Sequence, residues 1–277
     1  MSVEAAGTSP MEQLVPRVEH LIKTLDPLSI TGDKAHPVKL LWNDFQVSTY
    51  VVFFFIALIV TLAVVFWGKK RMALVPKGRA INAFEFVVEF ARNNIVGGII
   101  HKNPEKYTPT LLTLFFFILI NNFIGLIPGC KPGTGTIAGT AMLALVTFVY
   151  FTAAGVKAKG GLGYLGGLVP HGLPKPIVPL VFVIEFASML LKPVTHALRL
   201  FANMYAGHIV LGIFATMTEL FVLAPFEGQG WLNILASPVW LALLLAMYVL
   251  EFAVAAIQAY VFALLAAVYI DTATGSH

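Results

Sequence analysis

The stretch THALRLFANMYAGHIVLG, residues 195–212, places an arginine, an asparagine and two histidines inside a long apolar run. An arginine inside a membrane span costs at least about 3 kcal/mol on insertion scales, and its pKa above about 12 keeps it charged. The apolar run extends over residues 177–224, which as one helix would be about 72 Å long. The stretch therefore predicts a membrane helix in which Arg199 has a specific role.

Composition places the chain among polytopic membrane proteins. Of its 277 residues, 58% are hydrophobic and 12% are charged, and the mean hydropathy is +0.84. Soluble domains carry about 25% charged residues. The basic residues behind the net charge of +4 cluster after the first apolar segment, which fits membrane orientation. No basic stripe is interleaved with aromatic residues, so we expect no nucleic-acid partner. The single cysteine, Cys130, rules out an internal disulfide.

Three apolar segments have the ordinary length of a membrane span, which is about 20 residues. They occupy residues 47–67, 110–127 and 137–156. The basic segment GKKRMALVPKGR follows the first span, and the loop 157–176 holds three lysines and no acid. Both are cytoplasmic by the positive-inside rule. We therefore expect an outside N-terminal arm, residues 1–46, without a signal peptide, and a single membrane domain, residues 47–277.

Residues 80–100 have one polar face, because Asn82, Glu85, Glu89, Arg92 and Asn93 recur at steps of three and four. This pattern predicts an amphipathic helix. Two placements are open: flat at the cytoplasmic membrane interface, or packed on the protein's own body.

Two segments, residues 177–224 and 238–270, are longer than the bilayer core is thick. The first has room for two upright helices, but no polar turn divides it. One long, tilted helix is the simpler interpretation, followed by a turn at 225–237 and a second tilted helix back. The sequence thus predicts an all-α polytopic membrane protein. It has about five crossing helices and an interfacial amphipathic helix, and the last two crossings form a long, strongly tilted hairpin with a cytoplasmic C-terminus.

The motif GLGYLG at residues 161–166 matches G-x-G-x-x-G, but it follows a membrane span and precedes a proline-rich loop. A dinucleotide site requires a strand before this motif and a helix after it, so we expect a flexible cytoplasmic loop instead. The sequence contains no Walker motif, zincin motif or nucleophile elbow. We expect no metal, no cofactor and no catalysis of bond chemistry by this chain.

Arg199 has no carboxylate three or four residues away on its own helix, where a helical ion pair would form. Its compensating charge must come from another helix or another subunit, which favours a functional role over a structural ion pair. Asn203 lies one turn further on the same face, where holding water or a carboxylate and acting as helix–helix glue are equally open. Four residues with small side chains lie near Arg199 and Asn203, so another helix could pass close to this surface: Ala197, Ala202, Ala206 and Gly207.

A histidine and a carboxylate inside membrane spans indicate a proton relay. Here they are His208, about half a turn round the helix from Arg199, and Glu251, which shares a helix face with Gln258. The alternative is a buried hydrogen-bonded pair with no role in transport.

Two acidic residues, a lysine and a histidine also lie in the first long segment, residues 177–224. Glu185 is a candidate for a second polar pathway on the cytoplasmic side. Lys192 is expected to snorkel toward water. Glu219 lies near the outer end, where it can reach external water, and the sequence assigns no role to His196.

The sequence LRLFANMYAG at residues 198–207, with IEF at 184–186 and IQAYVF at 257–262, resembles subunit a of F-type ATP synthases. The resemblance covers residues 45–269 and not the N-terminal arm. It implies a non-catalytic proton-channel subunit of the membrane Fo sector, which couples proton flow to ring rotation and ATP synthesis. The implied partners are the c-subunit ring, the b-subunit peripheral stalk, the rest of the F1Fo complex and the lipid bilayer. The implied location is the bacterial inner membrane.

The resemblance also implies roles for residues. Arg199 would face the c-ring carboxylates and block a short circuit, with Asn203 beside it. His208, Glu251 and Gln258 would form the outer half-channel, and Glu185 the cytoplasmic one.

Two positions depart from the family pattern. Many bacterial members exchange the residue types found here at His208 and Glu251, and Ala202 stands where glycine is common. A solitary secondary transporter is the rival class, but the chain shows no repeated halves. A third option is a membrane scaffold with structural ion pairs. The two long apolar helices with polar residues at scattered positions argue against it.

Overall fold

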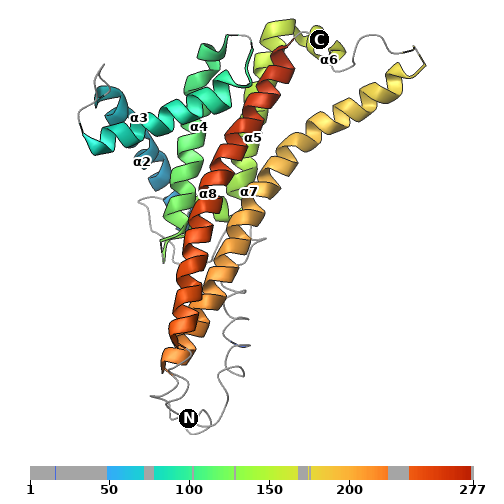
Figure 1. Cartoon of the computed structure of the whole chain (residues 1–277). Helices are drawn as coiled ribbons and strands as arrows, with labels where there is room; N and C mark the ends of the chain where they lie inside the picture. The colour runs from blue at the N-terminus through green and yellow to red at the C-terminus, as the bar shows by residue number, and fades with distance from the viewer. Residues whose placement is uncertain are drawn as a thin grey trace, which may run out of the picture.

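Figure 1 shows the computed structural model of the chain, which is built of helices. The structure describes residues 16, 49–71, 78–101, 103–127, 129–167, 174, 176–223 and 237–275, and no strand occurs in this part of the chain. The predicted N-terminal arm lies outside the described residues except for Pro16, and the predicted turn at 225–237 lies outside them except for Ser237.

Five helices are long and apolar enough to cross a membrane. They are α2 (Thr49–Arg71), α4 (Pro104–Gly125), α5 (Ile137–Lys159), α7 (Val178–Leu223) and α8 (Ser237–Thr274). The predicted all-α polytopic membrane fold with five crossings is confirmed.

Some helix ends lie beyond the apolar runs that predicted them, at the start of α4 and at the end of α5. α4 begins at Pro104 and not at residue 110, since a proline in the first turn loses no helical hydrogen bond. The side chain of Thr136 accepts a hydrogen bond from the Gly139 backbone N–H at 3.3 Å and caps the start of α5. Gly160, with a φ of 77°, ends α5.

The amphipathic segment forms α3 (Arg79–Ala91) and then a short π-helix, η1 (Arg92–Gly97), and not one regular helix to residue 100. α3 lies across one end of the bundle (Figure 1). The ring of Phe84 stacks on Phe116 at 5.4 Å, and a Cβ at Gly68 would overlap it. Phe86, in contrast, is 70% exposed. α3 therefore packs on the protein's own body and also presents apolar side chains outward.

α7 is one continuous helix, so the alternative of two upright helices is wrong. One half runs beside α8, and the half nearer its N-terminus curves away from the bundle (Figure 1). Pro193 lies inside α7, and a proline removes one helical hydrogen bond and favours a bend. The bent helix leaves an outlying segment at the same end of the bundle as α3 but on the opposite side (Figure 1).

The expectation of a flexible loop at GLGYLG is wrong, because these residues form a short helix, α6 (Gly161–Gly166). Its central residue, Tyr164, is only 6% exposed. A contact with helices far away in sequence fixes this segment, and local sequence rules give no signal of such a contact.

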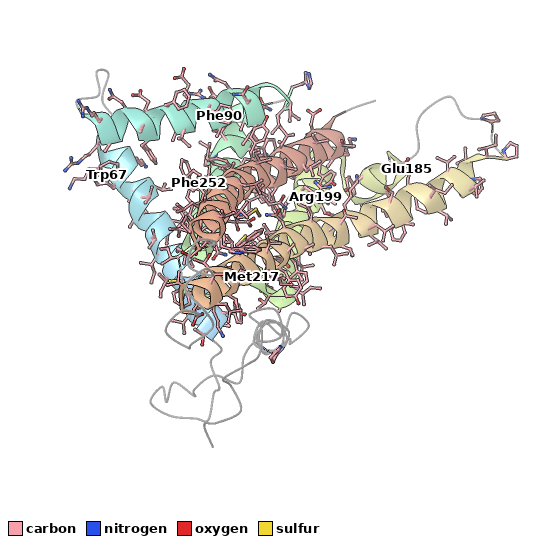
Figure 2. All side chains as sticks on the ribbon, turned by 60° about the horizontal axis from the view of Figure 1, so that its bottom comes forward. Trp67, Phe90, Glu185, Arg199, Met217 and Phe252 are labelled. Carbon is pink, nitrogen blue, oxygen red and sulfur yellow. The ribbon has the colours of Figure 1, made fainter. Side chains whose placement is uncertain are left out.

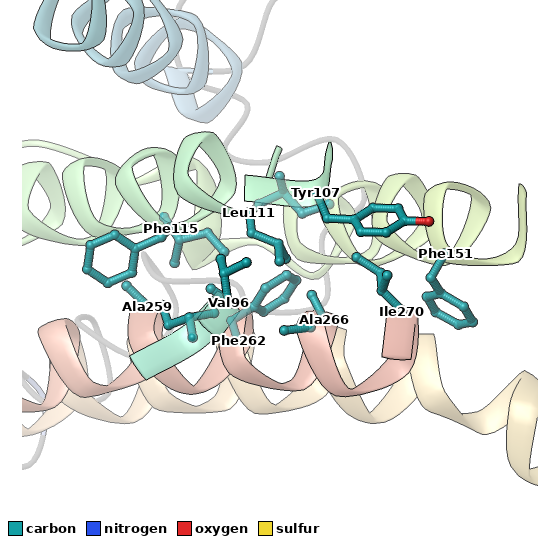
Figure 3. Packing of buried hydrophobic residues seen from close by; sticks show 14 of the residues in the cluster. Val96, Tyr107, Leu111, Phe115, Phe151, Ala259, Phe262, Ala266 and Ile270 are labelled. Carbon is teal, nitrogen blue, oxygen red and sulfur yellow. The ribbon is translucent and has the colours of Figure 1, made fainter. Parts of the chain in front are cut away.

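The hydrophobic core lies where α8 meets α4, α5 and η1 (Figure 3). Small residues on α8, among them Ala259 and Ala266, let the neighbouring helices approach closely. Large side chains from the other elements fill the space around them: Val96, Tyr107, Leu111, Phe115 and Phe151. This packing holds the face of α8 that carries the polar residues described below.

Candidate proton-pathway site

Gly207 of α7 lies directly beside Glu251 of α8, where the last two helices run side by side. A Cβ at Gly207 would overlap the Glu251 carboxylate, so only glycine leaves room for it. The Glu251 side chain is buried, with 6% exposure, although it lies in the middle of a membrane-length helix. Of the small residues noted in the sequence, Gly207 therefore has a specific packing role at this position, whereas Ala202 and Ala206 are exposed.

His208 follows Gly207 directly and lines a pocket. The pocket has a volume of about 50 Å³, enough for a few water molecules. The start of α2, the α4–α5 turn and α7 line it, through Tyr50, Cys130, Lys131, Pro132, Gly135, Tyr205 and His208. The Nε2 atom of His208 is buried and has no hydrogen-bond partner among the described residues. The structure thus brings His208, a polar pocket and Glu251 to one region of α7.

Gln258 lies two turns from Glu251 on the same face of α8, and both side chains are buried. The Nε2 atom of Gln258 has no partner among the described residues. Unpaired buried amides are rare, because each costs about 1–3 kcal/mol. Gln258 therefore has a free donor in the interior, as a relay or water-binding residue requires.

Arg199 lies near the middle of α7 and is exposed (Figure 2). Within the described part of the chain it forms no ion pair or hydrogen bond. The opposite side of the helix is buried, with Leu200 and Met204 nearly inaccessible. Arg199 is thus on an open face of a membrane helix, where this chain supplies no counter-charge.

Asn203 is half-buried one turn further along α7. Its Nδ2 atom is buried and unpaired among the described residues. The structure places it beside Arg199, as the sequence analysis expected, but gives it no bond to another helix of this chain.

Glu185 and Lys192 lie on the outlying segment of α7, and Figure 2 shows Glu185 there, well apart from Arg199. Both side chains are half-buried. The Lys192 ammonium lies over the Tyr269 ring at 5.0 Å from its centroid, a favourable cation–π position. Lys192 is therefore held against α8.

His196 is a core residue with 3% exposure. Its Nε2 lies 3.3 Å from the Phe262 carbonyl oxygen, and because a carbonyl only accepts, Nε2 must carry the proton of this bond. Its ring also meets the rings of Phe262 and Tyr269 edge-on. His196 ties α7 to α8 one turn before Arg199. Glu219, in contrast, is exposed near the far end of α7.

The sequence analysis missed two buried asparagines in α4. Asn122 donates from Nδ2 to the Ala255 carbonyl of α8 at 3.3 Å and accepts from the Thr134 hydroxyl at 3.0 Å. Asn121 accepts from the Gly133 N–H at 3.1 Å. The signal was present, because two adjacent amides interrupt an apolar span. Asn122 thus holds α8 about halfway between Glu251 and Gln258, and Asn121 holds the turn between α4 and α5.

No group of three or more His, Cys, Asp or Glu residues within the described ranges is arranged to hold a metal ion. The polar residues form a line of single groups along α7 and α8. Such a line can pass protons from one group or water molecule to the next.

Comparisons with known proteins agree on one family. The family model described as ATP synthase A chain matches residues 50–271. The ATP synthase subunit a of Sphingopyxis alaskensis is 38% identical over 225 residues, covering 79% of this chain and 84% of that protein. That of Bradyrhizobium diazoefficiens is 40% identical over 200 residues, covering 72% and 78%.

A third relative, the ATP synthase subunit a of an Anaeromyxobacter species, is 36% identical over 238 residues. The match covers 84% of this chain and 56% of that protein, so the chain spans just over half of that relative's length.

Proposed function

The chain belongs to the ATP synthase A chain family, and from this membership we propose that it carries protons to and from the c-ring of a rotary ATP synthase. Members of the family are non-catalytic membrane subunits of ATP synthases, and the five apolar helices fit a multi-pass membrane protein. The c-ring, the b-subunit stalk and the remaining F1Fo subunits are its proposed partners, and the bacterial inner membrane is its proposed location.

The observation that carries the proposal is Arg199. It is a permanent charge on the open face of a membrane-length helix, with no counter-charge in the described part of the chain. A partner that passes a carboxylate across this face would supply that charge. Each ring carboxylate would lose its proton near Arg199 and take up another beyond it.

We propose two separate proton paths to that face. The outer path runs through the pocket at His208 and continues past Glu251 and Gln258. Support comes from the pocket, the Gly207 gap that holds the Glu251 carboxylate, and the unpaired donor of Gln258. The cytoplasmic path runs along Glu185. Arg199 stands between the two paths and repels free protons, which prevents a direct leak.

Orientation follows from the basic residues at one end of the bundle. Lys69, Lys70 and Arg71 end α2 and are exposed, so the positive-inside rule makes this end cytoplasmic. The pocket at His208 then opens on the outer side, and the C-terminus is cytoplasmic.

ATP-driven proton pumping by the assembled complex in inverted vesicles tests the two paths. We expect Glu251→Gln and Glu185→Gln to reduce pumping while uncoupled ATP hydrolysis persists, because each removes a titratable carboxylate. Glu219→Gln is the matched control, since Glu219 is exposed near the helix end and outside both paths. If Glu251→Gln pumps at the wild-type rate, the proposed outer path is wrong. If Glu185→Gln pumps at the wild-type rate, the proposed cytoplasmic path is wrong.

A further inference from the structure

The outlying segment of α7, residues 178–195, has very little contact with the rest of the chain. Its inward face consists of residues spaced by four, four and three: Val181, Glu185, Met189 and Lys192. Of the whole segment only Met189 is buried, with 6% exposure. On the outer face, Leu180 and Val183 are each 63% exposed. The position of Glu185 therefore depends on what holds Met189, one turn away, and on the contact of Lys192 with the Tyr269 ring.

Tyr164 of α6 holds Met189. Its hydroxyl donates to the Met189 sulfur at 3.5 Å, a weak hydrogen bond. Burial raises the pKa of the Tyr164 hydroxyl above its usual value, so the donor proton is present at neutral pH.

The Tyr164 ring fills a space that α5 and α8 leave open. A Cβ at Gly155 of α5 would overlap this ring and would lie 3.0 Å from the Ala273 Cβ of α8. The ring thus packs against α5 and its hydroxyl against α7, at the point where the end of α8 also comes close.

We propose that Tyr164 is a positioning residue that clips the Glu185-bearing segment of α7 to α5 and α8. The inference rests on the proposed function, in which Glu185 lies on the cytoplasmic proton path. The clip gives a physical reason for the glycine-rich hexapeptide at residues 161–166 to form a helix here.

Two flanking positions of α6 have room for a side chain, because a Cβ at Gly161 or Gly166 would meet no atom within 4 Å. Gly160 has a φ of 77°, which favours glycine. Tyr164 is buried and belongs, with Met189, to the hydrophobic core cluster, so Tyr164→Ala removes a core contact and should release the segment.

Thiol labelling measures the position of the segment directly. Cysteine replaces Glu185 in the assembled complex, in inverted vesicles whose cytoplasmic face is outward. A water-soluble methanethiosulfonate is added, and mass spectrometry quantifies modification of the peptide that carries residue 185, so Cys130 is retained. We expect Tyr164→Ala to raise the labelling rate about tenfold, because local opening of about 1.4 kcal/mol is tenfold in population.

Conservative and matched variants separate the parts of the contact. Tyr164→Phe keeps the ring and removes the hydroxyl that contacts Met189, so we expect labelling between that of wild type and that of Tyr164→Ala. Gly155→Ala should mimic Tyr164→Ala, because the added methyl displaces the ring. Gly161→Ala places the same methyl in open space and should have no effect. The proposal would be overturned if neither Tyr164→Ala nor Gly155→Ala changed the labelling rate. It would also be overturned if Gly161→Ala raised the labelling rate as much as those two variants.

A functional measurement, made with Glu185 intact, distinguishes positioning from general damage. We expect Tyr164→Ala to change how pumping depends on cytoplasmic pH and to leave its dependence on the opposite side unaltered. Equal changes on both sides would overturn the positioning role. If Glu185→Gln pumps normally while labelling still responds to Tyr164→Ala, the cytoplasmic path fails and the clip stands as a structural contact.

Discussion

At the scale of single residues, Gly207 makes a tight contact, because the Glu251 carboxylate occupies the space of its missing Cβ. Gly207→Ala should displace this carboxylate. Overpacking costs about 1–3 kcal/mol, and each 1.4 kcal/mol is about tenfold in rate, so we expect pumping to fall roughly tenfold. Pumping assays on inverted vesicles check this.

Shortening the carboxylate provides the control for that prediction. Glu251→Asp combined with Gly207→Ala makes room for the methyl and should recover part of the lost pumping. Absence of any recovery, or wild-type pumping by Gly207→Ala alone, would show that the two residues are not coupled.

His196 makes one buried hydrogen bond across the helix pair. His196→Leu removes the donor and should lower the free energy of unfolding by about 1 kcal/mol. His196→Gln can place an amide N–H near the position of Nε2 and should lose less than half of that. Denaturation of the purified protein in detergent measures both. Equal losses in the two variants would mean that ring packing, and not the hydrogen bond, is what His196 contributes.

At the scale of elements, α4 holds α8 through Asn122, which makes two buried hydrogen bonds. Asn122→Leu would leave the Thr134 hydroxyl without that acceptor, at a cost of about 1–3 kcal/mol. We therefore expect a clear drop in melting temperature. Thr113→Val is the matched control, because the Thr113 hydroxyl is exposed and bonds only to its own helix. If Asn122→Leu left the melting temperature unchanged, the Asn122 hydrogen bonds would not be what holds α8 against α4.

The tie between the end of α8 and the loop before α4 should matter far less. The His101 backbone N–H and its ring Nδ1 lie 3.1 and 3.4 Å from the Asp271 carboxylate. The His101 side chain is 82% exposed, and exposed ion pairs contribute at most about 1 kcal/mol. His101→Ala keeps the backbone bond, so we expect the melting temperature to stay near wild type. A loss as large as that of Asn122→Leu would contradict this ranking.

Hydropathy predicted the elements well, because a helix that crosses a bilayer needs a long apolar run. In α7 no polar turn divides the run into two helices. It could not predict the start of α4 at Pro104 or the end of α8 at Thr274. It also missed α6, whose buried Tyr164 depends on contacts with Gly155 and with Met189, 25 residues away.

The site was predicted unevenly for the same physical reason. A charged residue such as Arg199 or Glu251 is easily recognised in a membrane span, because placing a charge there costs free energy and points to a specific role. Asn121 and Asn122 carry no charge, and their importance follows from contacts that only the fold creates. The pocket at His208 joins α2, a turn and α7, and no sequence pattern indicates such a meeting.

At the scale of the whole molecule, the packing is one-sided. α8 is buried against α4 and α5, while α7 curves away from the bundle (Figure 1) and carries Arg199 on a face that nothing in the described chain covers. A subunit that must stay fixed while a ring turns beside it needs such an open face, with one fixed charge at its centre. The two proposed proton paths lie on either side of that charge.

ATP-driven proton pumping in inverted vesicles tests this central claim most directly, comparing the wild-type complex with Arg199→Ala and Arg199→Lys. We predict that both variants assemble and retain ATP hydrolysis while pumping is abolished. Lysine keeps the charge but, as a compact ammonium, lacks the planar, multi-donor guanidinium. Normal pumping by either variant would make Arg199 a structural residue and would contradict the account.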